Sequence, residues 1–527
     1  MKLFSSVLML GLTGTLLSFR GDHNDRVNLS TVVKIKNEGF NNSKVMETLF
    51  ELTDVNGPRL TGSNGMRNAE KWAKEKMESW GLSNVKIEPW GSFGKGWEIN
   101  KCYVAMTVPY YQQLIASPRA WTPGTNGPVN ATATLVRVDS TQDMAKYTGT
   151  LRGKIVVLSS MNNETKPNFT ADAKRYTAEE LVNISGDPHN DEGVTYLSQK
   201  PKAAAKPPVN LRRAIDSFLL QEGATAVLSG GRGTMGTLFT SNGAPRAWDA
   251  KPVLPELELG SEHLGRLVRL LEAGKEVRLE MDTRTTFLTE DSTENNVMAE
   301  IPGTDPDLKA ELVMLGAHMD SWHASTGATD NGTGTVVMME AVRILKAIKV
   351  KPLRTIRVVL WSGEEQGLLG SRGYVKKHFA NRLTMELKPA QERVSAYYNL
   401  DNGGGKIRGI FLQGNDELRD VFETWLKPFH DLGATTVTIK NTGSTDHIAF
   451  DEVGIPGFQF IQDPLEYGSR THHTNMDSYE RVSSNDLMQA SIIVASFVYN
   501  TAMRDEKLPR KPLPVVKDKV NGTSWNR

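Results

Sequence analysis

The chain has 527 residues and a formal charge of +1, and 39% of its residues are hydrophobic and 23% charged. This length exceeds one ordinary core, so we expect two domains, or one large domain with an insertion. The nearly balanced charge gives no reason to expect a nucleic acid or an anionic membrane as partner. The single cysteine, Cys102, excludes an intrachain disulfide and a thiolate metal cluster. Any metal must therefore be held by His, Asp and Glu.

Residues 1–20 have the pattern of a secretory signal peptide. Lys2 precedes an apolar stretch of roughly 17 residues, which is short for a membrane span, and the polar run RGDHNDR follows. No clear A-x-A cleavage pattern is present, so a retained N-terminal anchor is the alternative. No later apolar run is long enough to span a bilayer. We therefore expect a secreted or periplasmic protein without a stable membrane partner.

Residues 27–114 have an α/β pattern and are assigned to the first part of the main domain. The stretch Arg67–Trp80 places Ala69, Trp72, Ala73 and Met77 at helical spacing, and a glycine follows it. This spacing predicts a helix with one apolar face.

Residues 115–288 have a different sequence pattern, in which short apolar runs alternate with turns. Two such runs are Ile155–Leu158 and Ala224–Leu228. We interpret this region as a separate, inserted β-rich domain. The polar stretch 160–210 inside it, rich in Asn, Lys and Pro, is left without a role.

Residues 289–508 return to an α/β pattern, and 509–527 are interpreted as a C-terminal tail. Apolar strands alternate with helices, which predicts a mostly parallel twisted sheet flanked by helices. The strands are expected at 313–315, 357–360 and 396–400, and the helices at 336–349, 370–379 and 487–503.

Acids and histidines follow these strands. In open α/β sheets, ligand sites lie at the carboxyl ends of the strands. The residues in such positions are His318, Asp320, Asp330, Glu364, Glu365, Asp401, His472, His473 and Asp477. Each is ambiguous alone, since a single histidine after a strand is more often structural and Asp330 fits a helix N-cap equally well.

Together these residues supply two histidines and three carboxylates as metal ligands, plus a spare glutamate. Imidazole and carboxylate ligands without thiolate suit a catalytic zinc pair or another divalent metal. Five side chains suffice for two metals about 3.5–4 Å apart when one carboxylate bridges them. Of the adjacent Glu364 and Glu365, one would then bind a metal and the other would accept and donate protons.

Several stretches, in order between residues 295 and 500, resemble the cocatalytic dizinc exopeptidases, the family of bacterial leucyl aminopeptidases and plasma glutamate carboxypeptidase. They are GAHMDSW, GATDNGTG, WSGEEQGLLGSRGY, YNLDNGGG, STDHIAFDEVGIP and THHTNMDSY. The resemblance implies the zinc exopeptidase fold. The inserted region resembles a protease-associated domain, which in such enzymes often covers the active site.

The resemblance also implies a role for each residue. Asp330 matches the bridging carboxylate. His318 and Asp401 match the other ligands of one Zn²⁺, and Glu365 and His473 match those of the second Zn²⁺. Glu364 matches the general base, and Asp320 matches the acid that orients His318. The pattern His-[ST]-x-x-Asp favours His473 over His472, whose role stays open. Tyr467 is a candidate oxyanion donor or a packing residue, and His447 is a candidate supporting residue near the substrate.

The implied reaction is hydrolysis of a terminal bond in a peptide or dipeptide, by a water shared between the two zinc ions and deprotonated by Glu364. We expect an aminopeptidase, with a carboxypeptidase or dipeptidase of the same family as the alternative. An aminoacylase-type amidohydrolase, a one-zinc glutaminyl cyclase and a receptor-like protein without activity are further alternatives. The complete five-ligand set argues against the last two. Residue preference, native metal and oligomeric state are left open.

Overall fold

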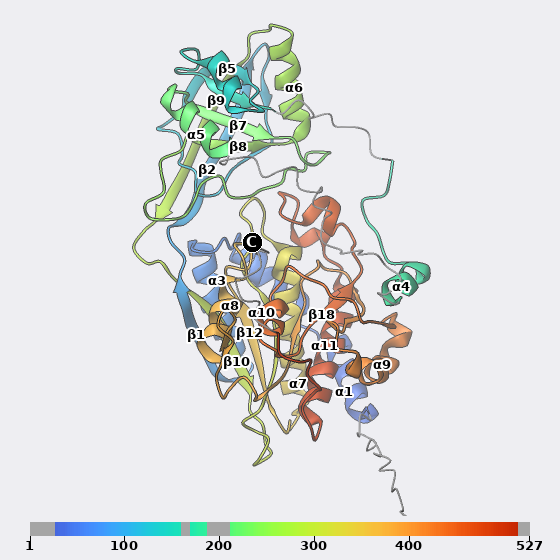
Figure 1. Cartoon of the computed structure of the whole chain (residues 1–527). Helices are drawn as coiled ribbons and strands as arrows, with labels where there is room; N and C mark the ends of the chain where they lie inside the picture. Colours follow the sequence, from blue (N-terminus) through green and yellow to red (C-terminus); the bar gives the residue numbers. More distant parts are fainter. Residues whose placement is uncertain (1–26, 160–168, 187–210, 515–527) are drawn as a thin grey trace, which may run out of the picture.

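The computed structural model describes residues 27–159, 169–186 and 211–514. Two eight-stranded sheets form two bodies, one above the other in Figure 1. The predicted signal peptide and the last part of the predicted tail lie outside the described residues. Within the described part, 509–514 lies against the larger body, where Arg510 donates to the carbonyl of Gln391 at 2.9 Å.

The larger body has a mixed sheet whose centre is parallel. In the order β1-β10-β12-β11-β15-β18-β16-β17, the pairings among β12, β11, β15 and β18 are parallel, as predicted. The pairs β1–β10, β10–β12 and β16–β18 are antiparallel. The strands are β1 (Ser83–Ser92), β10 (Thr293–Ile301), β11 (Leu312–His318), β12 (Thr355–Trp361), β15 (Val394–Asn399), β16 (Ile407–Phe411), β17 (Thr436–Thr438) and β18 (Gly457–Gln462), with a small hairpin of β13 (Ala380–Asn381) and β14 (Glu386–Leu387).

Helices cover both faces of this sheet. Alternate residues of each strand face opposite sides, so Val313 and Leu315 enter one core and Met314 the other. On the first face lie α1 (Leu29–Asn41), α2 (Val45–Phe50), α3 (Asn64–Ser79), α7 (Thr333–Ala347), α9 (Arg419–Leu426) and α11 (Ser484–Met503); on the second lie α8 (Leu369–His378) and α10 (His447–Asp451). Single 3₁₀ or π turns are η1 (Glu51–Val55), η2 (Thr141–Tyr147), η4 (Ala328–Gly332), η5 (Asp416–Leu418), η6 (Lys427–Leu432), η7 (Tyr467–Thr471) and η8 (Tyr479–Arg481).

The smaller body is a second mixed sheet in the order β3-β2-β9-β5-β6-β7-β8-β4. Its strands are β2 (Gly96–Val108), β3 (Gln112–Gln113), β4 (Ala116–Pro118), β5 (Val129–Val136), β6 (Ile155–Leu158), β7 (Ala226–Gly230), β8 (Glu256–Leu259) and β9 (Arg278–Leu288). Because β2 pairs along its length with β9, this body, called the insert below, begins near Gly96. The expected boundary at residue 115 therefore lies too late, because β2 and β3 precede it.

Among the described residues, three helices belong to the insert by sequence. The helices α5 (Leu211–Gln221) and α6 (Ser261–Glu272) pack on its sheet, whereas α4 (Ala178–Ser185) lies apart from it (Figure 1). Among the described residues, no helix combines the length and apolar character needed to cross a membrane.

Candidate metal centre

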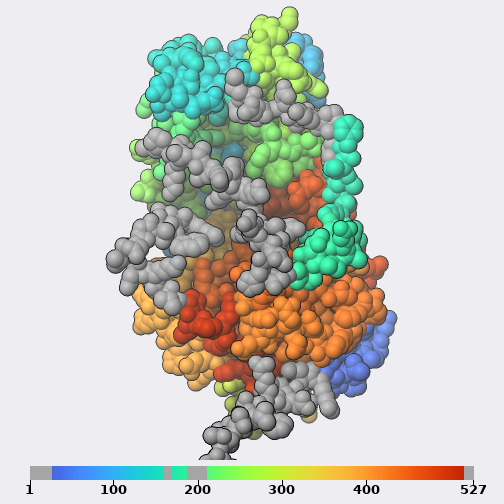
Figure 2. Space-filling model, turned by 45° about the vertical axis from the view of Figure 1, so that its right-hand side comes forward, coloured from blue at the N-terminus to red at the C-terminus, as the bar shows by residue number. Residues whose placement is uncertain are grey.

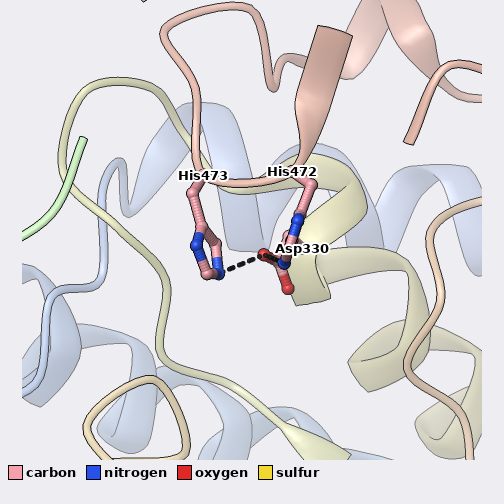
Figure 3. Close-up of side chains that lie close together, drawn as sticks. All are labelled: Asp330, His472 and His473. Atoms are coloured by element: carbon pink, nitrogen blue, oxygen red, sulfur yellow. Dashed lines mark ion pairs between the residues drawn. The ribbon is translucent and has the colours of Figure 1, made fainter. Parts of the chain in front are cut away.

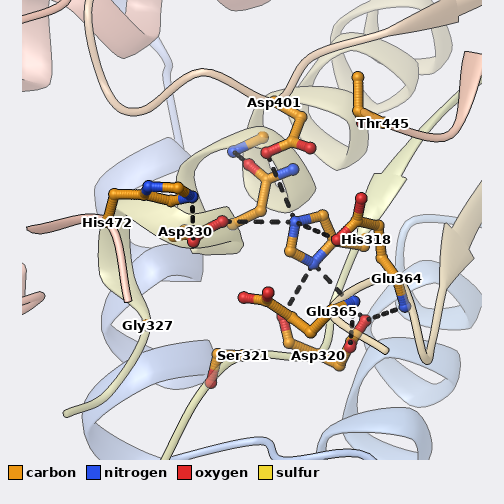
Figure 4. Close-up of polar contacts among 12 residues, drawn as sticks. His318, Asp320, Ser321, Gly327, Asp330, Glu364, Glu365, Asp401, Thr445 and His472 are labelled. Atoms are coloured by element: carbon orange, nitrogen blue, oxygen red, sulfur yellow. Dashed lines mark hydrogen bonds and ion pairs between the residues drawn. The ribbon is translucent and has the colours of Figure 1, made fainter. Parts of the chain in front are cut away.

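The candidate residues meet at one edge of the larger sheet. His318 is the last residue of β11, Glu364 and Glu365 follow β12, and Asp401 follows β15. The loop 463–477, called the ligand loop below, follows β18 and carries His472 and His473. Since these four strands are parallel neighbours, their carboxyl ends lie side by side (Figure 4).

Asp330 lies between two histidines. Its turn, η4, precedes α7, and the side chain is buried. Its Oδ1 lies 3.4 Å from Nε2 of His318, and its Oδ2 lies 3.2 Å from Nε2 of His473 (Figures 3 and 4). One carboxylate therefore offers one oxygen to each of two groups, which is the arrangement of a bridging ligand.

The first group is His318, Asp330 and Asp401, and all three are buried. Oδ1 of Asp401 lies 3.4 Å from Nε2 of His318. One ligand atom from each residue lies within 4.8 Å of the others. Among the described residues, Oδ1 of Asp401 has no hydrogen-bond partner. Burying an oxygen acceptor without a donor costs free energy, so a cation bound beside this oxygen would be stabilising.

The second group is His473, Glu365 and the other oxygen of Asp330. Nε2 of His473 lies 2.8 Å from Oε2 of Glu365, and the indole N–H of Trp322 donates to the same oxygen at 2.8 Å. The other oxygen of Glu365 has no hydrogen-bond partner in the described part of the chain. The His473 side chain is 33% exposed and that of His318 only 1%, so this group lies on the open side of the site.

Asp320 supports both His318 and the glutamates. Nδ1 of His318 lies 3.0 Å from the backbone oxygen of Asp320 and 3.5 Å from its carboxylate. A proton on Nδ1 donated there leaves the Nε2 lone pair free for a metal. The same carboxylate accepts from the backbone N–H groups of Glu364 and Glu365, both at 3.3 Å, and from the hydroxyl of Thr61 at 3.0 Å. Asp320 therefore fixes the geometry of the glutamate pair as well as the histidine.

The charges of the acids favour cations in both groups. Burial disfavours a charged imidazole, but the nearby Asp401 and Glu364 outweigh it and raise the pKa of His318 well above its ordinary value. Burial is likewise outweighed at His473, where Glu365 and Asp330 raise the pKa to about 11. Without metals, protons on the two histidines partly balance the acids. Two divalent cations would balance them more fully, and the donor set of imidazole and carboxylate fits such ions.

Glu364 differs from Glu365 in its contacts. Its Oε2 lies 3.9 Å from Nε2 of His318, farther than the oxygens of Asp330 and Asp401. Burial raises the pKa of Glu364 well above the ordinary value, and the neighbouring charge of Asp401 adds to the shift. A carboxyl group with a raised pKa beside a metal site is suited to accept a proton and return it.

Two further residues support the site, and one of them, Arg59, was not singled out from the sequence. The Arg59 guanidinium donates to the backbone oxygens of Met319 at 2.7 Å and Gly327 at 2.8 Å. The carboxylate of Asp477 accepts from the backbone N–H groups of Thr329 at 2.6 Å and Asp330 at 3.0 Å. Asp477 had a signal, the His-[ST]-x-x-Asp spacing, whereas Arg59 had none, because its partners lie more than 250 positions away.

Tyr467 and His472 lie on the open side. The ring centroids of Tyr467 and His472 are 4.7 Å apart, and those of His472 and His473 are 3.9 Å apart. Nε2 of His472 lies 3.9 Å from Oδ2 of Asp330, against 3.2 Å for His473, so the geometry favours His473 as the ligand (Figure 3). Burial and the charges of Asp330 and Asp401 raise the pKa of Tyr467 well above 10, so its phenol stays a proton donor.

His447 lies apart from the two groups. It begins α10 and is fully buried, and its Nε2 contacts the amide of Gln413 and lies 3.2 Å from the oxygen of Thr442. Burial lowers its pKa to about 4. A fully buried imidazole with these partners has no surface to offer a substrate, so its placement does not support the expected contact.

Comparison with known proteins finds a family match over part of the chain. The profile of "Peptidase family M28" matches residues 296–498. Carboxypeptidase Q of Bos taurus is 26% identical over 484 residues, which cover 92% of this chain and 89% of the relative. A peptidase M28 precursor from Shewanella amazonensis has a similar structure, with TM-score 0.65 and 23% identity over 92% of this chain and 98% of that one. BSAP, a zinc aminopeptidase from Bacillus subtilis, matches with TM-score 0.54 and 21% identity over 88% of this chain and 95% of that one.

Proposed function

Because residues 296–498 belong to peptidase family M28, we propose that the protein is a metallo-exopeptidase that holds two Zn²⁺ per chain and hydrolyses terminal peptide bonds. The single observation that carries the metal count is the placement of Asp330, whose two oxygens face two separate histidines. His318 and Asp401 would complete one metal position, and Glu365 and His473 the other.

When bound, the zinc ions supply Lewis acidity, which polarises the scissile carbonyl and lowers the pKa of water. The chain's own residues handle the proton. Glu364 accepts it from the attacking water and later delivers it to the leaving amine. Its raised pKa favours holding that proton between the two steps. Tyr467, which stays protonated, would donate a hydrogen bond to the developing oxyanion.

The electrostatics support an aminopeptidase. An aminopeptidase needs an acid beside the free amine of its substrate, whereas a carboxypeptidase needs a basic clamp for a carboxylate. The two arginines beside the site, Arg59 and Arg470, are buried and already occupied. Arg59 donates to backbone oxygens, and Arg470 donates to the carboxylate of Asp172 at 2.7 Å and to the oxygen of Thr234 at 2.6 Å.

One observation favours a second candidate. The similarity to carboxypeptidase Q extends over both bodies of the chain, since it covers 92% of its residues. A carboxypeptidase or dipeptidase would use the same metals and the same Glu364, but would select the other end of the substrate.

The test is a substrate panel for the purified, zinc-loaded chain. We expect hydrolysis of aminoacyl-anilides and free dipeptides, none of N-blocked dipeptides, and none by the Glu364→Gln variant, which controls for contaminating peptidases. Cleavage of N-blocked dipeptides would transfer the assignment to a carboxypeptidase. No hydrolysis of any member by protein that holds its metals would refute the exopeptidase proposal.

We also propose that the chain is exported and that the insert is a protease-associated domain. The N-terminal pattern supports export, and the packing of Trp121 in the insert against Trp322, which donates to Glu365, supports a covering role. N-terminal sequencing of protein recovered from the periplasm or medium tests export directly. An intact Met1 on protein that stays in the cytoplasm would contradict it.

A further inference from the structure

A short segment of the insert lies on the larger body, next to the metal centre. It comprises residues 169–186, which include α4, and is called the strap below. Figure 1 shows α4 beside α9 and β18, well away from the insert's own sheet, and Figure 2 shows it as a teal projection against the larger body. The sequence marks this stretch only as polar, so its position raises the question of what it does there.

The strap is anchored by α4. Leu181 and Ile184 are buried against Ile461 of β18, the strand that leads into the ligand loop. The helix begins with a capping box, in which the hydroxyl of Thr177 accepts from the backbone N–H of Glu180 and the Glu180 carboxylate accepts from that of Thr177. A capped helix with a buried apolar face is a firm attachment for the residues that precede it.

Those preceding residues bind the start of the ligand loop. Lys174 and Leu465 exchange two backbone hydrogen bonds, of 3.0 and 2.8 Å, as neighbours in an antiparallel bridge. The Arg175 guanidinium pairs with the carboxylate of Asp463 at 2.9 Å and with that of Asp486 at 2.8 Å. Asp463, the first residue of the ligand loop, is fully buried, so its charge depends on such partners.

Arg470 joins the strap, the insert and the ligand loop. Its Nε and Nη2 donate to the carboxylate of Asp172 in the strap at 3.0 and 2.7 Å. Its Nη1 donates to the backbone oxygen of Thr234 at 2.6 Å and to the hydroxyl of Thr237 at 2.8 Å, both in the insert. Arg470 is buried and stands three residues before His473, so these bonds fix the backbone that presents the ligand.

The insert also bonds the ligand loop directly. The backbone N–H of Thr240 donates to the carbonyl of His473 itself at 2.8 Å. Leu238 and Asn475 exchange two further hydrogen bonds, of 2.9 and 3.2 Å. Phe239 and Thr474 are neighbours in an antiparallel bridge. The ligand loop is therefore bonded both by the strap and by residues 234–240 of the insert.

We propose that the strap positions the ligand loop and thereby sets the affinity of the metal position formed by His473 and Glu365, with Asp172 and Arg470 as its positioning residues. A loop held in place loses less conformational entropy when it binds a metal. The other position takes His318 and Asp401 from the ends of β11 and β15, outside the ligand loop, and shares only Asp330 with the position of His473. This inference rests on the proposed two-metal function.

The test compares Asp172→Asn with Asp216→Asn in the full-length chain. Asp216 is a matched control, because it is also a partly buried acid of the insert bonded to an arginine Nε at 2.8 Å, but its partner, Arg212, belongs to the insert and not to the ligand loop. Metal-free protein is titrated with Zn²⁺ by calorimetry, and hydrogen exchange is followed in peptides that cover 463–477. These two readouts are independent of peptidase activity.

For Asp172→Asn we expect one of the two Zn²⁺ affinities to fall about 10- to 100-fold, the range typical for residues that support metal ligands, with the other unchanged. Exchange in 463–477 should become faster, kcat should fall and Asp172→Glu should recover most of the affinity. Asp216→Asn should match the wild type in all of these. If both Zn²⁺ affinities of Asp172→Asn equal those of the wild type, or both fall alike, the strap does not position one metal site and the proposal fails. A chain that binds two Zn²⁺ and cleaves no peptide would refute the peptidase proposal while leaving this test intact.

Discussion

Glu364 and Glu365 are neighbours in sequence with different surroundings. Glu365 contacts His473 and Trp322, whereas Glu364 lies 3.9 Å from Nε2 of His318 and has a strongly raised pKa. We predict that Glu364→Gln lowers kcat about 10²- to 10⁴-fold, the usual contribution of a general base, with both metals retained. Steady-state kinetics together with metal analysis by plasma mass spectrometry measures this.

Glu365→Gln is the matched variant for that prediction. It removes the same charge one residue away, and we expect it to lose one metal as well as activity. Should Glu364→Gln lose a metal too, or keep most of its kcat, the division of roles between the two glutamates would be wrong.

Tyr467 offers a second prediction at a single residue. Its phenol stays protonated because burial and the surrounding carboxylates raise its pKa well above 10. We predict that Tyr467→Phe lowers kcat about 10²-fold, as loss of one oxyanion donor does, and leaves KM and metal content close to wild type. A variant that changes KM alone would make Tyr467 a packing or binding residue, because the ring would matter without its hydroxyl.

The sequence predicts that the five candidate ligands lie together, whereas most of the contacts that support them cannot be read from it. His318, Asp330, Glu365, Asp401 and His473 follow strands or precede a helix, and the rule for parallel sheets places such residues together. The supports depend on contacts between remote segments. The hydroxyl of Thr61 donates to Asp320, which lies 259 positions later in the chain, and no local sequence pattern predicts such a hydrogen bond.

Strands and helices of the larger body are predicted more reliably than the boundary of the insert. The strand expected at 357–360 lies within β12, and the helix expected at 487–503 lies within α11. The strand β2 was assigned to the wrong body, because it follows β1 after only three residues but pairs with β9. Strand propensity indicates an extended segment and carries no information on which sheet it joins.

Helix α3 and strand β10 bury two acids against each other, which makes their packing sensitive to pH. Burial raises the pKa of Glu70 to about 7 and, with the added charge of Glu70, that of Glu294 to about 8, from 4.5. The folded chain therefore keeps protons that the unfolded chain releases above pH 4.5. The stabilising effect is complete below that pH and is lost as the pH rises through 7 to 8.

We accordingly predict that Glu294→Gln, which cannot ionise, stabilises the protein relative to wild type at pH 8.5 by roughly 1–3 kcal/mol, with little gain at pH 4.5. Thermal unfolding of both proteins across this pH range measures the difference. Glu75→Gln, at an exposed position of the same helix, should show no such trend. An equal effect of Glu294→Gln at both pH values would contradict the buried-pair explanation.

The two bodies are joined around the metal centre. Trp97, Trp121 and Ala120 of the insert region share a buried cluster with Leu60 and Trp322 of the larger body. Trp322 in turn donates to Glu365, so the packing between the bodies reaches a candidate ligand directly. The sequence indicates an insert but not that it contributes to the site, because these contacts arise only when the chain is folded.

The proposed mechanism requires two metal positions that share Asp330. Its most direct test is native mass spectrometry of the full-length chain after reconstitution with Zn²⁺, compared with His473→Ala and His318→Ala. We predict two zinc ions on the wild type and a loss of one or both in each variant. A single zinc ion on the wild type, or two zinc ions retained without His473, would contradict it.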